Sequence, residues 1–118
     1  MQYDSRTPIY LQVIDDIKKR IIKGEIKPGS KLPGTRELAV KYEVNPNTAA
    51  RIYKEMEQMD LCFVERGKGT FVNSSDELLP NLKNEVIGTL VDNFVAQMSE
   101  LGFSRQEIID KIKNKETE

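Results

Sequence analysis

Histidine and tryptophan are absent from the 118-residue sequence, and it contains a single cysteine, Cys62. Without histidine, the chain lacks a leading zinc ligand and the side chain that most often serves acid–base catalysis at neutral pH. One cysteine cannot form an internal disulfide, which is typical of a protein from a reducing cytoplasm. We therefore expect a cytoplasmic protein with no metal centre, no cofactor and no disulfide framework.

Long hydrophobic runs are missing as well, since no apolar stretch approaches the roughly 20 residues of a membrane span. The first four residues show neither the basic nor the apolar part of a signal peptide. No nucleophile–base set, metal cluster or phosphate loop is present, so we expect no enzyme. Asp15 and Asp16 are adjacent in a predicted helix and would point to different sides, so we interpret them as solvated side chains and not as a catalytic pair.

The residues that are present indicate a small globular protein with an uneven charge distribution. Hydrophobic residues make up 38% of the chain and charged residues 31%, which suits one compact domain or a small domain with an appendage. Residues 1–73 hold 13 Lys and Arg against 10 Asp and Glu, a net charge of +3. Residues 74–118 hold 5 against 9, a net charge of −4. A mildly basic module followed by an acidic tail is compatible with nucleic-acid binding but does not establish it.

Two short helices joined by a tight turn are predicted between residues 35 and 59. The first covers residues 35–42, and the second begins at Pro46, after Asn45 as N-cap, and ends near Met59. Such a short connection predicts a helix-turn-helix, whose second helix enters a DNA major groove. Helical spacing places the apolar side chains of this second helix on one side. Its polar side chains lie on the other side: Asn47, Thr48, Arg51 and Lys54.

A basic β-hairpin is predicted directly after this helix pair. Two β-prone runs, residues 61–65 and 70–72, flank the turn Arg66-Gly67-Lys68-Gly69. A hairpin in this place is a wing, and its tip can reach a minor groove, where Arg and Lys find concentrated negative potential. Upstream, Thr7 as N-cap and Pro8 at the first helical position predict another helix, which ends at Gly24.

The tail is predicted to form two helices with more apolar surface than they can hide. A long helix is expected over residues 78–101, and Ser104 with Glu107 predicts a capping box for a second helix. A monomer rarely exposes a contiguous apolar patch beyond about a few hundred Å2. Packing on the N-terminal module would hide part of the stripe, whereas a second copy of the chain would hide more. The expected dimer-interface residues are Leu82, Val86, Leu90, Val91, Phe94, Val95, Met98 and Leu101.

Three motifs in this order resemble the GntR family of bacterial transcription regulators. They are LPGTRELA at residues 32–39, Asn47-Thr48, and GKGTFV at residues 67–72. The resemblance covers about residues 7–73, and a tail of two helices is similar to the small YtrA-like branch of that family. It implies a homodimer that binds an operator and, in many members, controls an adjacent transporter operon.

The resemblance implies that Arg36 lies on the phosphates or bases and that the start of the second helix lies in the major groove. Glu43 stands where the family commonly has a turn glycine, and Gly34 where it usually has serine. Surface ion pairs are the alternative for Arg36 and for Arg51, which could pair with Glu55 one helical turn away. The expected DNA-binding residues are Arg36, Asn47, Thr48, Arg51, Lys54, Arg66, Gly67, Lys68, Gly69 and Thr70.

Taken together, these features predict a mostly α fold with a small β-hairpin wing. A winged helix-turn-helix is expected over residues 1–75 and a two-helix C-terminal dimerisation domain over residues 76–118. The predicted function is that of a homodimeric repressor that binds a palindromic operator in double-stranded DNA. The alternative is a winged-helix module that binds protein and not DNA. Any small-molecule effector would have to bind in the dimer cleft, because the tail is too small to enclose a cavity within one chain.

Overall fold

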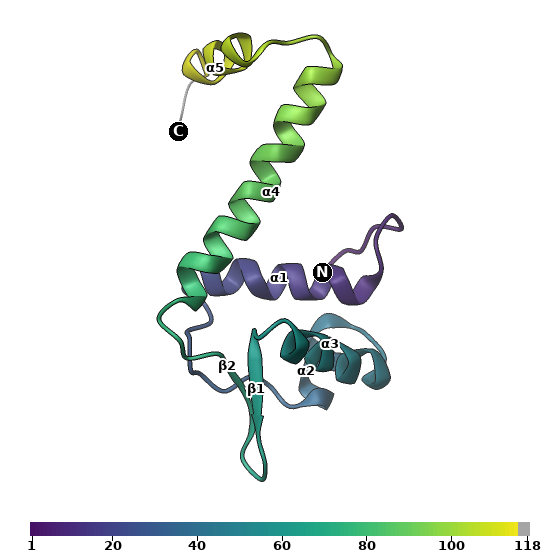
Figure 1. Cartoon of the computed structure of the whole chain (residues 1–118). Helices are drawn as coiled ribbons and strands as arrows, with labels where there is room; N and C mark the ends of the chain where they lie inside the picture. The colour runs from purple at the N-terminus through teal and green to yellow at the C-terminus, as the bar shows by residue number, and fades with distance from the viewer. Residues whose placement is uncertain (116–118) are drawn as a thin grey trace. The chain divides into compact units, whose positions relative to one another are not determined.

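In the computed structural model, residues 1–115 are described, and they form five helices and one antiparallel hairpin (Figure 1). Two compact units divide the chain after Leu82. The mostly α fold with a hairpin wing is confirmed. The last three residues of the predicted tail lie outside the described part. The elements are α1 (Ile9–Ile22), α2 (Thr35–Tyr42), α3 (Pro46–Gln58), β1 (Cys62–Glu65), β2 (Gly69–Val72), α4 (Leu78–Glu100) and α5 (Arg105–Lys113).

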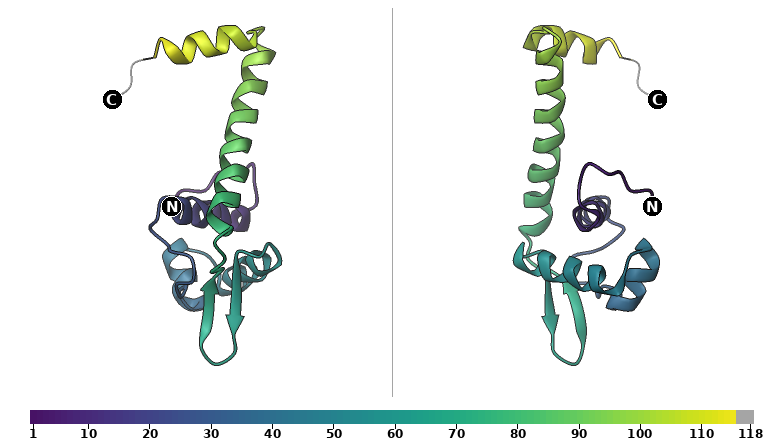
Figure 2. Two further views of the ribbon diagram at one scale, coloured as in Figure 1. Left: turned by 60° about the vertical axis from the view of Figure 1, so that its left-hand side comes forward. Right: turned by 90° about the vertical axis from the view of Figure 1, so that its right-hand side faces the viewer.

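The N-terminal unit is built around the apolar faces of α1, α2 and α3, which pack on one another. Apolar residues recur every three or four positions in each helix, so each presents one stripe to the common core. The hairpin extends away from this group of helices (Figures 1 and 2). Burying one such large side chain fully contributes about 1.5–3 kcal/mol. The largest fully buried side chains are Ile14, Ile17, Ile21, Leu38, Ile52, Met56, Val13 and Val72.

The start of α1 differs from the sequence prediction. Pro8 and not Thr7 is the N-cap, and no side chain caps the helix. The carbonyl oxygen of Thr7 accepts a hydrogen bond from the Gln12 side-chain amide at 2.7 Å, and the same amide donates to Asp4. The prediction of Thr7 as N-cap is therefore wrong. At the other end, Gly24 follows the helix with φ 83°, which confirms it as the stop.

The turn between α2 and α3 is closed by local hydrogen bonds. The Asn45 side chain accepts a hydrogen bond from the backbone N–H of Asn47 at 2.7 Å, which confirms the predicted N-cap. Glu43 adopts the left-handed conformation, with φ 55° and ψ 46°. The N–H groups of Glu43 and Val44 bond back to Val40 and Ala39, at 3.2 and 2.9 Å. This pattern is a Schellman motif, in which glycine is the usual left-handed residue.

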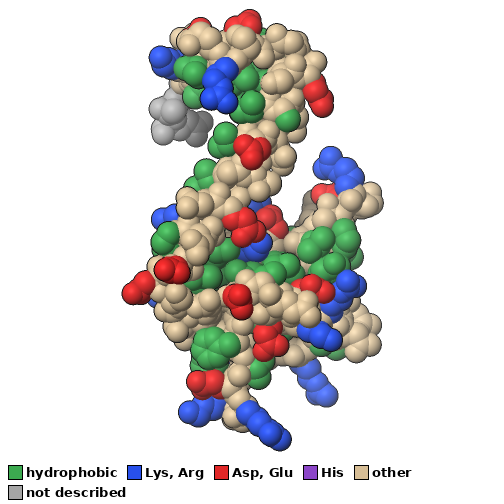
Figure 3. Space-filling model, viewed as in Figure 1, with side chains coloured by type: hydrophobic (Ala, Val, Ile, Leu, Met, Phe, Trp, Pro, Cys, Tyr) green, Lys and Arg blue, Asp and Glu red, His purple; other side chains and the backbone are tan. Residues whose placement is uncertain are grey.

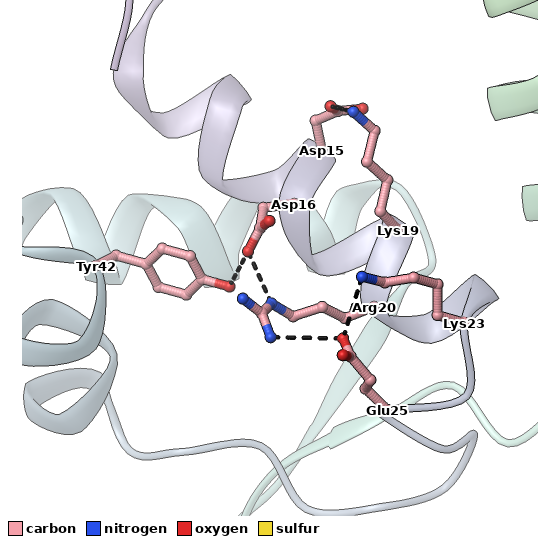
Figure 4. A network of polar contacts seen from close by, with 7 residues as sticks. All are labelled: Asp15, Asp16, Lys19, Arg20, Lys23, Glu25 and Tyr42. Atoms are coloured by element: carbon pink, nitrogen blue, oxygen red, sulfur yellow. Dashed lines mark hydrogen bonds and ion pairs between the residues drawn. The ribbon is translucent and has the colours of Figure 1, made fainter. Parts of the chain in front are cut away.

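A cluster of polar contacts joins α1 to the end of α2 (Figure 4). Asp16 accepts hydrogen bonds from Arg20 at 2.9 Å and from the Tyr42 hydroxyl at 2.8 Å. Arg20 also pairs with Glu25, at 3.5 Å. The interpretation of Asp16 as a merely solvated side chain is therefore wrong. Asp15 is exposed and pairs with Lys19 one turn along, at 3.0 Å. We call Asp16, Arg20 and Tyr42 the Asp16 cluster.

The wing consists of β1 and β2. The segment around Lys31 lies along the outer edge of β2. Phe63 lies opposite Phe71 in the register, and their rings stack with centroids 5.8 Å apart. Lys31 forms an isolated antiparallel bridge with Phe71. The flanking hydrogen bonds run from the Leu32 N–H to Thr70 at 2.8 Å and from the Val72 N–H to Ser30 at 2.9 Å. These bonds hold Lys31 beside the wing.

The first turns of α4 belong to the N-terminal unit. Leu78 and Leu82 are buried in its core, and this burial moves the division between the units to Leu82. Leu82, predicted as a dimer-interface residue, is thus buried within the single chain. In the second unit, the predicted capping box is confirmed: Ser104 accepts from the Glu107 N–H, and the Glu107 carboxylate accepts from the Ser104 N–H at 3.0 Å.

Residues 1–115 show features of neither a membrane span nor a metal cluster. None of the helices there combines the length and the apolar character needed to cross a membrane. The same residues contain no group of three or more His, Cys, Asp or Glu side chains arranged to hold a metal ion.

Candidate nucleic-acid interface

The helix α3 has one buried face and one exposed polar face. Ala49, Ile52, Tyr53 and Met56 are buried, as the apolar spacing predicted. On the opposite side Asn47, Arg51 and Lys54 are exposed, whereas Thr48 is half-buried. This exposed surface presents amide, guanidinium and ammonium donors. Such donors match the acceptors that purine bases show in a major groove.

Arg51 is held by two contacts and still reaches solvent. Its guanidinium carbon lies 3.9 Å from the centre of the Tyr10 ring in α1. Its Nε lies 3.8 Å from the carboxylate of Glu55, which is the ion pair weighed as the alternative to DNA contact. The Arg51 side chain nevertheless remains 57% exposed. The ion pair with Glu55 and a contact to DNA are therefore compatible, because the ion pair leaves the Arg51 side chain at the surface.

Arg36 lies in the first turn of α2, where the positive end of the helix disfavours a cation unless an anion is near. Its side chain is exposed and lines a shallow surface groove with Val40, Val44 and Pro46. Pro46 is the first residue of α3. The fold therefore places Arg36 next to the N-terminal end of α3, where the predicted base-reading residues begin.

The tip of the wing carries exposed cations. Arg66 and Lys68 are exposed, and basic side chains project at the end of the hairpin in Figure 3. Lys68 lies 3.9 Å from Glu65, a contact between two largely exposed groups that contributes little. Gly67 has φ 80°, so the turn itself favours glycine there.

Gly69 has a second structural role that the sequence did not indicate. A Cβ at this position would lie 2.8 Å from Cε of Lys31, so the lysine side chain crosses the space that glycine leaves open. Lys31 is thereby brought to a groove lined by Gly69, Thr70 and the start of α2. Thr70, predicted to contact DNA, is half-buried, and its carbonyl oxygen accepts the hydrogen bond from Leu32.

Lys31 was missed in the sequence prediction. The turn formed by Pro28 and Gly29 is the one local signal that the chain returns towards the sheet. Nothing in the sequence indicates that the Lys31 side chain crosses Gly69.

Two titratable side chains next to α3, Cys62 and Tyr53, are buried. Burial raises the pKa of the Cys62 thiol to about 11, so the thiol is protonated at neutral pH. The Tyr53 hydroxyl donates a hydrogen bond to the Pro33 carbonyl, and burial raises the pKa of Tyr53 as well. These groups connect α3 to the start of α2 and to β1. They hold the polar face of α3 in place and do not offer reactive groups to a substrate.

Comparison with known proteins places these features in a family. The family described as "Bacterial regulatory proteins, gntR family" matches residues 9–72, which include α1, the helix-turn-helix and the wing. The chain belongs to the GntR family. It is accordingly a transcription regulator with a DNA-binding winged helix. This confirms the predicted family and function class, and nothing favours the alternative of a protein-binding module.

Similar proteins include regulators of comparable size. The HTH-type transcriptional regulator YhcF of Bacillus subtilis is 42% identical over 112 residues, which are 95% of this chain and 93% of that protein. The transcriptional repressor YtrA of the same organism is 45% identical over 71 residues, 60% of this chain and 55% of that protein. A GntR family transcriptional regulator from Listeria monocytogenes has a similar solved structure. Its TM-score is 0.89 at 36% identity, with 97% of this chain and 100% of that chain covered.

Proposed function

We propose that the chain is a homodimeric repressor that binds a palindromic operator in double-stranded DNA in the cytoplasm, with a transporter operon as the expected target. The observation that carries this proposal is the exposed donor face of α3 together with the cations of the wing tip in one N-terminal unit. A winged helix needs both parts, because the helix reads base edges and the wing holds the phosphate backbone.

Within this proposal the exposed residues have two kinds of role. Asn47 and Thr48 lie in the first turn of α3, the end that points into the groove, and they read bases. Arg36 and Lys68 bind phosphates and set affinity at all sequences alike. Lys31, whose side chain crosses Gly69, adds a phosphate contact beside the wing.

The dimer is proposed to form through α4 and α5. Most of the apolar side chains of this unit face solvent in the single chain. A second copy that covers them would place two recognition helices about 34 Å apart, or a multiple of this spacing, on one face of the duplex. Any effector would then bind in the cleft between the two copies. The large exposed apolar side chains from Lys83 onward are Ile87, Leu90, Val91, Phe94, Leu101, Ile109 and Ile112.

Affinity measured at several salt concentrations tests the DNA-binding proposal. Each neutralised phosphate contributes about −0.9 to the slope of log affinity against log salt, so a dimer with a few contacts per subunit should give about −5. The measurement should use a duplex selected from random sequence by the intact protein. A flat salt dependence, or a failure to select any sequence, would reject the proposal in favour of a module that binds protein.

Binding-site selection with Asn47→Ala and with Lys68→Ala separates the two roles. Losing a base contact should cost about 1–3 kcal/mol at one operator position and relax selectivity there. Losing a phosphate contact should weaken all sequences about equally. If all three proteins select the same motif with the same stringency, Asn47 does not read a base.

A charge on the apolar side of α4 tests the dimer. Phe94 is 41% exposed in the single chain. Phe94→Glu should therefore convert the dimer to a monomer in light scattering. It should also weaken binding to a palindrome at least about tenfold, because the second half-site no longer binds at high effective concentration. Ala96→Glu is the matched control, because it places the same charge about 200° around the helix. A wild-type protein that is monomeric at micromolar concentration, or equal effects of the two variants, would reject the interface.

A further inference from the structure

A tyrosine from α1 stacks on the recognition helix, at a contact to which the sequence assigned no function. The guanidinium carbon of Arg51 lies 3.9 Å from the centroid of the Tyr10 ring. We propose that Tyr10 is a positioning residue that orients Arg51 to read a guanine in the operator. This inference rests on the proposed insertion of α3 into the major groove.

The two contacts of Arg51 leave its base-reading edge available. All five guanidinium N–H groups lie in the plane of the group, and the Tyr10 ring covers one face of that plane. Glu55 lies on the Nε side, at 3.8 Å. The ion pair is made by Nε, and the other donors of the group are the two terminal Nη groups. These form a planar fork that matches the O6 and N7 acceptors of guanine, the most frequent base-specific contact of arginine.

Orientation matters because arginine is a long side chain with many rotamers. A free arginine must lose this rotamer freedom when it binds a base, and the loss lowers affinity. Tyr10 reduces the loss, because an aromatic ring has only two side-chain torsions and its own position is fixed by packing. Tyr10 is half-buried against the hydrophobic core, and α1 packs on α3. The ring is therefore a rigid support for the guanidinium.

The support depends on the ring and not on the hydroxyl. Tyr10→Phe should therefore retain the guanine preference, whereas Tyr10→Leu keeps an apolar side chain against the core but removes the stacking surface. The stacking interaction at an exposed site corresponds to a change of about twofold to fivefold in an equilibrium constant. Removing the guanidinium in Arg51→Ala should have the larger effect, about fivefold to 150-fold at the base pair that it reads.

The experiment uses the full chain and binding-site selection, followed by titrations of duplexes with each base at the position affected by Arg51→Ala. We expect wild type and Tyr10→Phe to prefer guanine there equally. Tyr10→Leu should lose about twofold to fivefold of this preference at that position alone. Tyr10→Leu added to Arg51→Ala should change selectivity no further, because the supported group is already absent. Thermal unfolding checks that each variant is folded.

NMR of the Arg51 side chain is a second measurement, which detects the stacking directly. It tests the proposal even if Tyr10→Leu does not fold. The NMR signals of the Arg51 side chain should be shifted by the ring current in wild type and in Tyr10→Phe. Arg51→Lys keeps the positive charge, so it should keep the salt dependence of wild type. Its ammonium can still donate to guanine O6 or N7 but has no planar fork, so the guanine preference should weaken.

The possible failures are distinguishable. If the wild-type protein selects no sequence, the proposed DNA-reading function fails together with this inference. The inference alone is overturned if Tyr10→Leu retains the full guanine preference, if Tyr10→Phe loses it, or if the Arg51 signals show no ring-current shift. It is also overturned if Arg51→Ala selects the wild-type motif unchanged, because Arg51 then reads no base.

Discussion

Replacing Glu43 by glycine should stabilise the turn that orients α3. Glu43 has φ 55° and ψ 46°, in the left-handed helical region. For a residue with a Cβ this conformation costs about 1–2 kcal/mol, whereas glycine adopts it freely. The Glu43 side chain is exposed, so its removal exposes no core. The Schellman hydrogen bonds of the turn involve backbone atoms only and are retained in the variant.

The expected gain is smaller than the strain that is relieved. Glycine gives the unfolded chain more freedom, which offsets about 0.5–1 kcal/mol. The free energy of unfolding should therefore rise by about 0.5–1 kcal/mol in Glu43→Gly. For a chain of this size the corresponding increase in Tm is about 2–6 °C.

Urea and thermal unfolding followed by circular dichroism measure this difference. Glu43→Ala is the control, because it removes the carboxylate but keeps a Cβ, and it should give no comparable gain. An equal gain in Glu43→Ala would show that the carboxylate, and not the backbone conformation, limits stability. A Glu43→Gly protein no more stable than wild type would show that the turn stores no strain at this position.

Two further predictions concern the N-terminal unit. Burial would raise the pKa of Asp16, but hydrogen bonds from Arg20 and Tyr42 outweigh it and lower that pKa. The stabilisation is therefore present above the unfolded pKa of about 3.9 and is lost as the pH falls through the lower folded value. At pH 7, Asp16→Asn should lower the free energy of unfolding by about 1 kcal/mol, a value discounted for the partial exposure of Asp16. In urea unfolding, the stability of this variant should decline less below about pH 4 than that of wild type. A decline as large as in wild type would contradict this role of Asp16. Gly69→Ala should destabilise the wing by about 1–3 kcal/mol, because φ is 124° there. By moving Lys31, it should also reduce the salt slope of DNA binding by about 0.9 per protomer. Lys31→Gln should reduce the slope by the same amount without loss of stability. An unchanged slope in both variants would remove Lys31 from the phosphate contacts.

The sequence by itself determined the elements whose signals are local. Asn45 caps α3, and Ser104 with Glu107 caps α5, because each hydrogen bond joins residues two or three positions apart. Apolar spacing likewise predicted the buried face of α3, since the period of a helix follows from its backbone geometry. The order of the three family motifs was sufficient to predict the winged helix-turn-helix and its function class.

Only the tertiary structure decided which distant residues meet. Tyr10 and Arg51 are far apart in sequence, as are Lys31 and Gly69, and their contacts arise because α1 packs on α3 and because the chain near residue 31 returns to the edge of the wing. The sequence also assigned Leu82 to the dimer interface, although an apolar position in a helical stripe packs equally well against the chain's own core, where the structure buries it. Periodicity specifies which face of a helix is buried, but the partner of that face depends on how the helices pack.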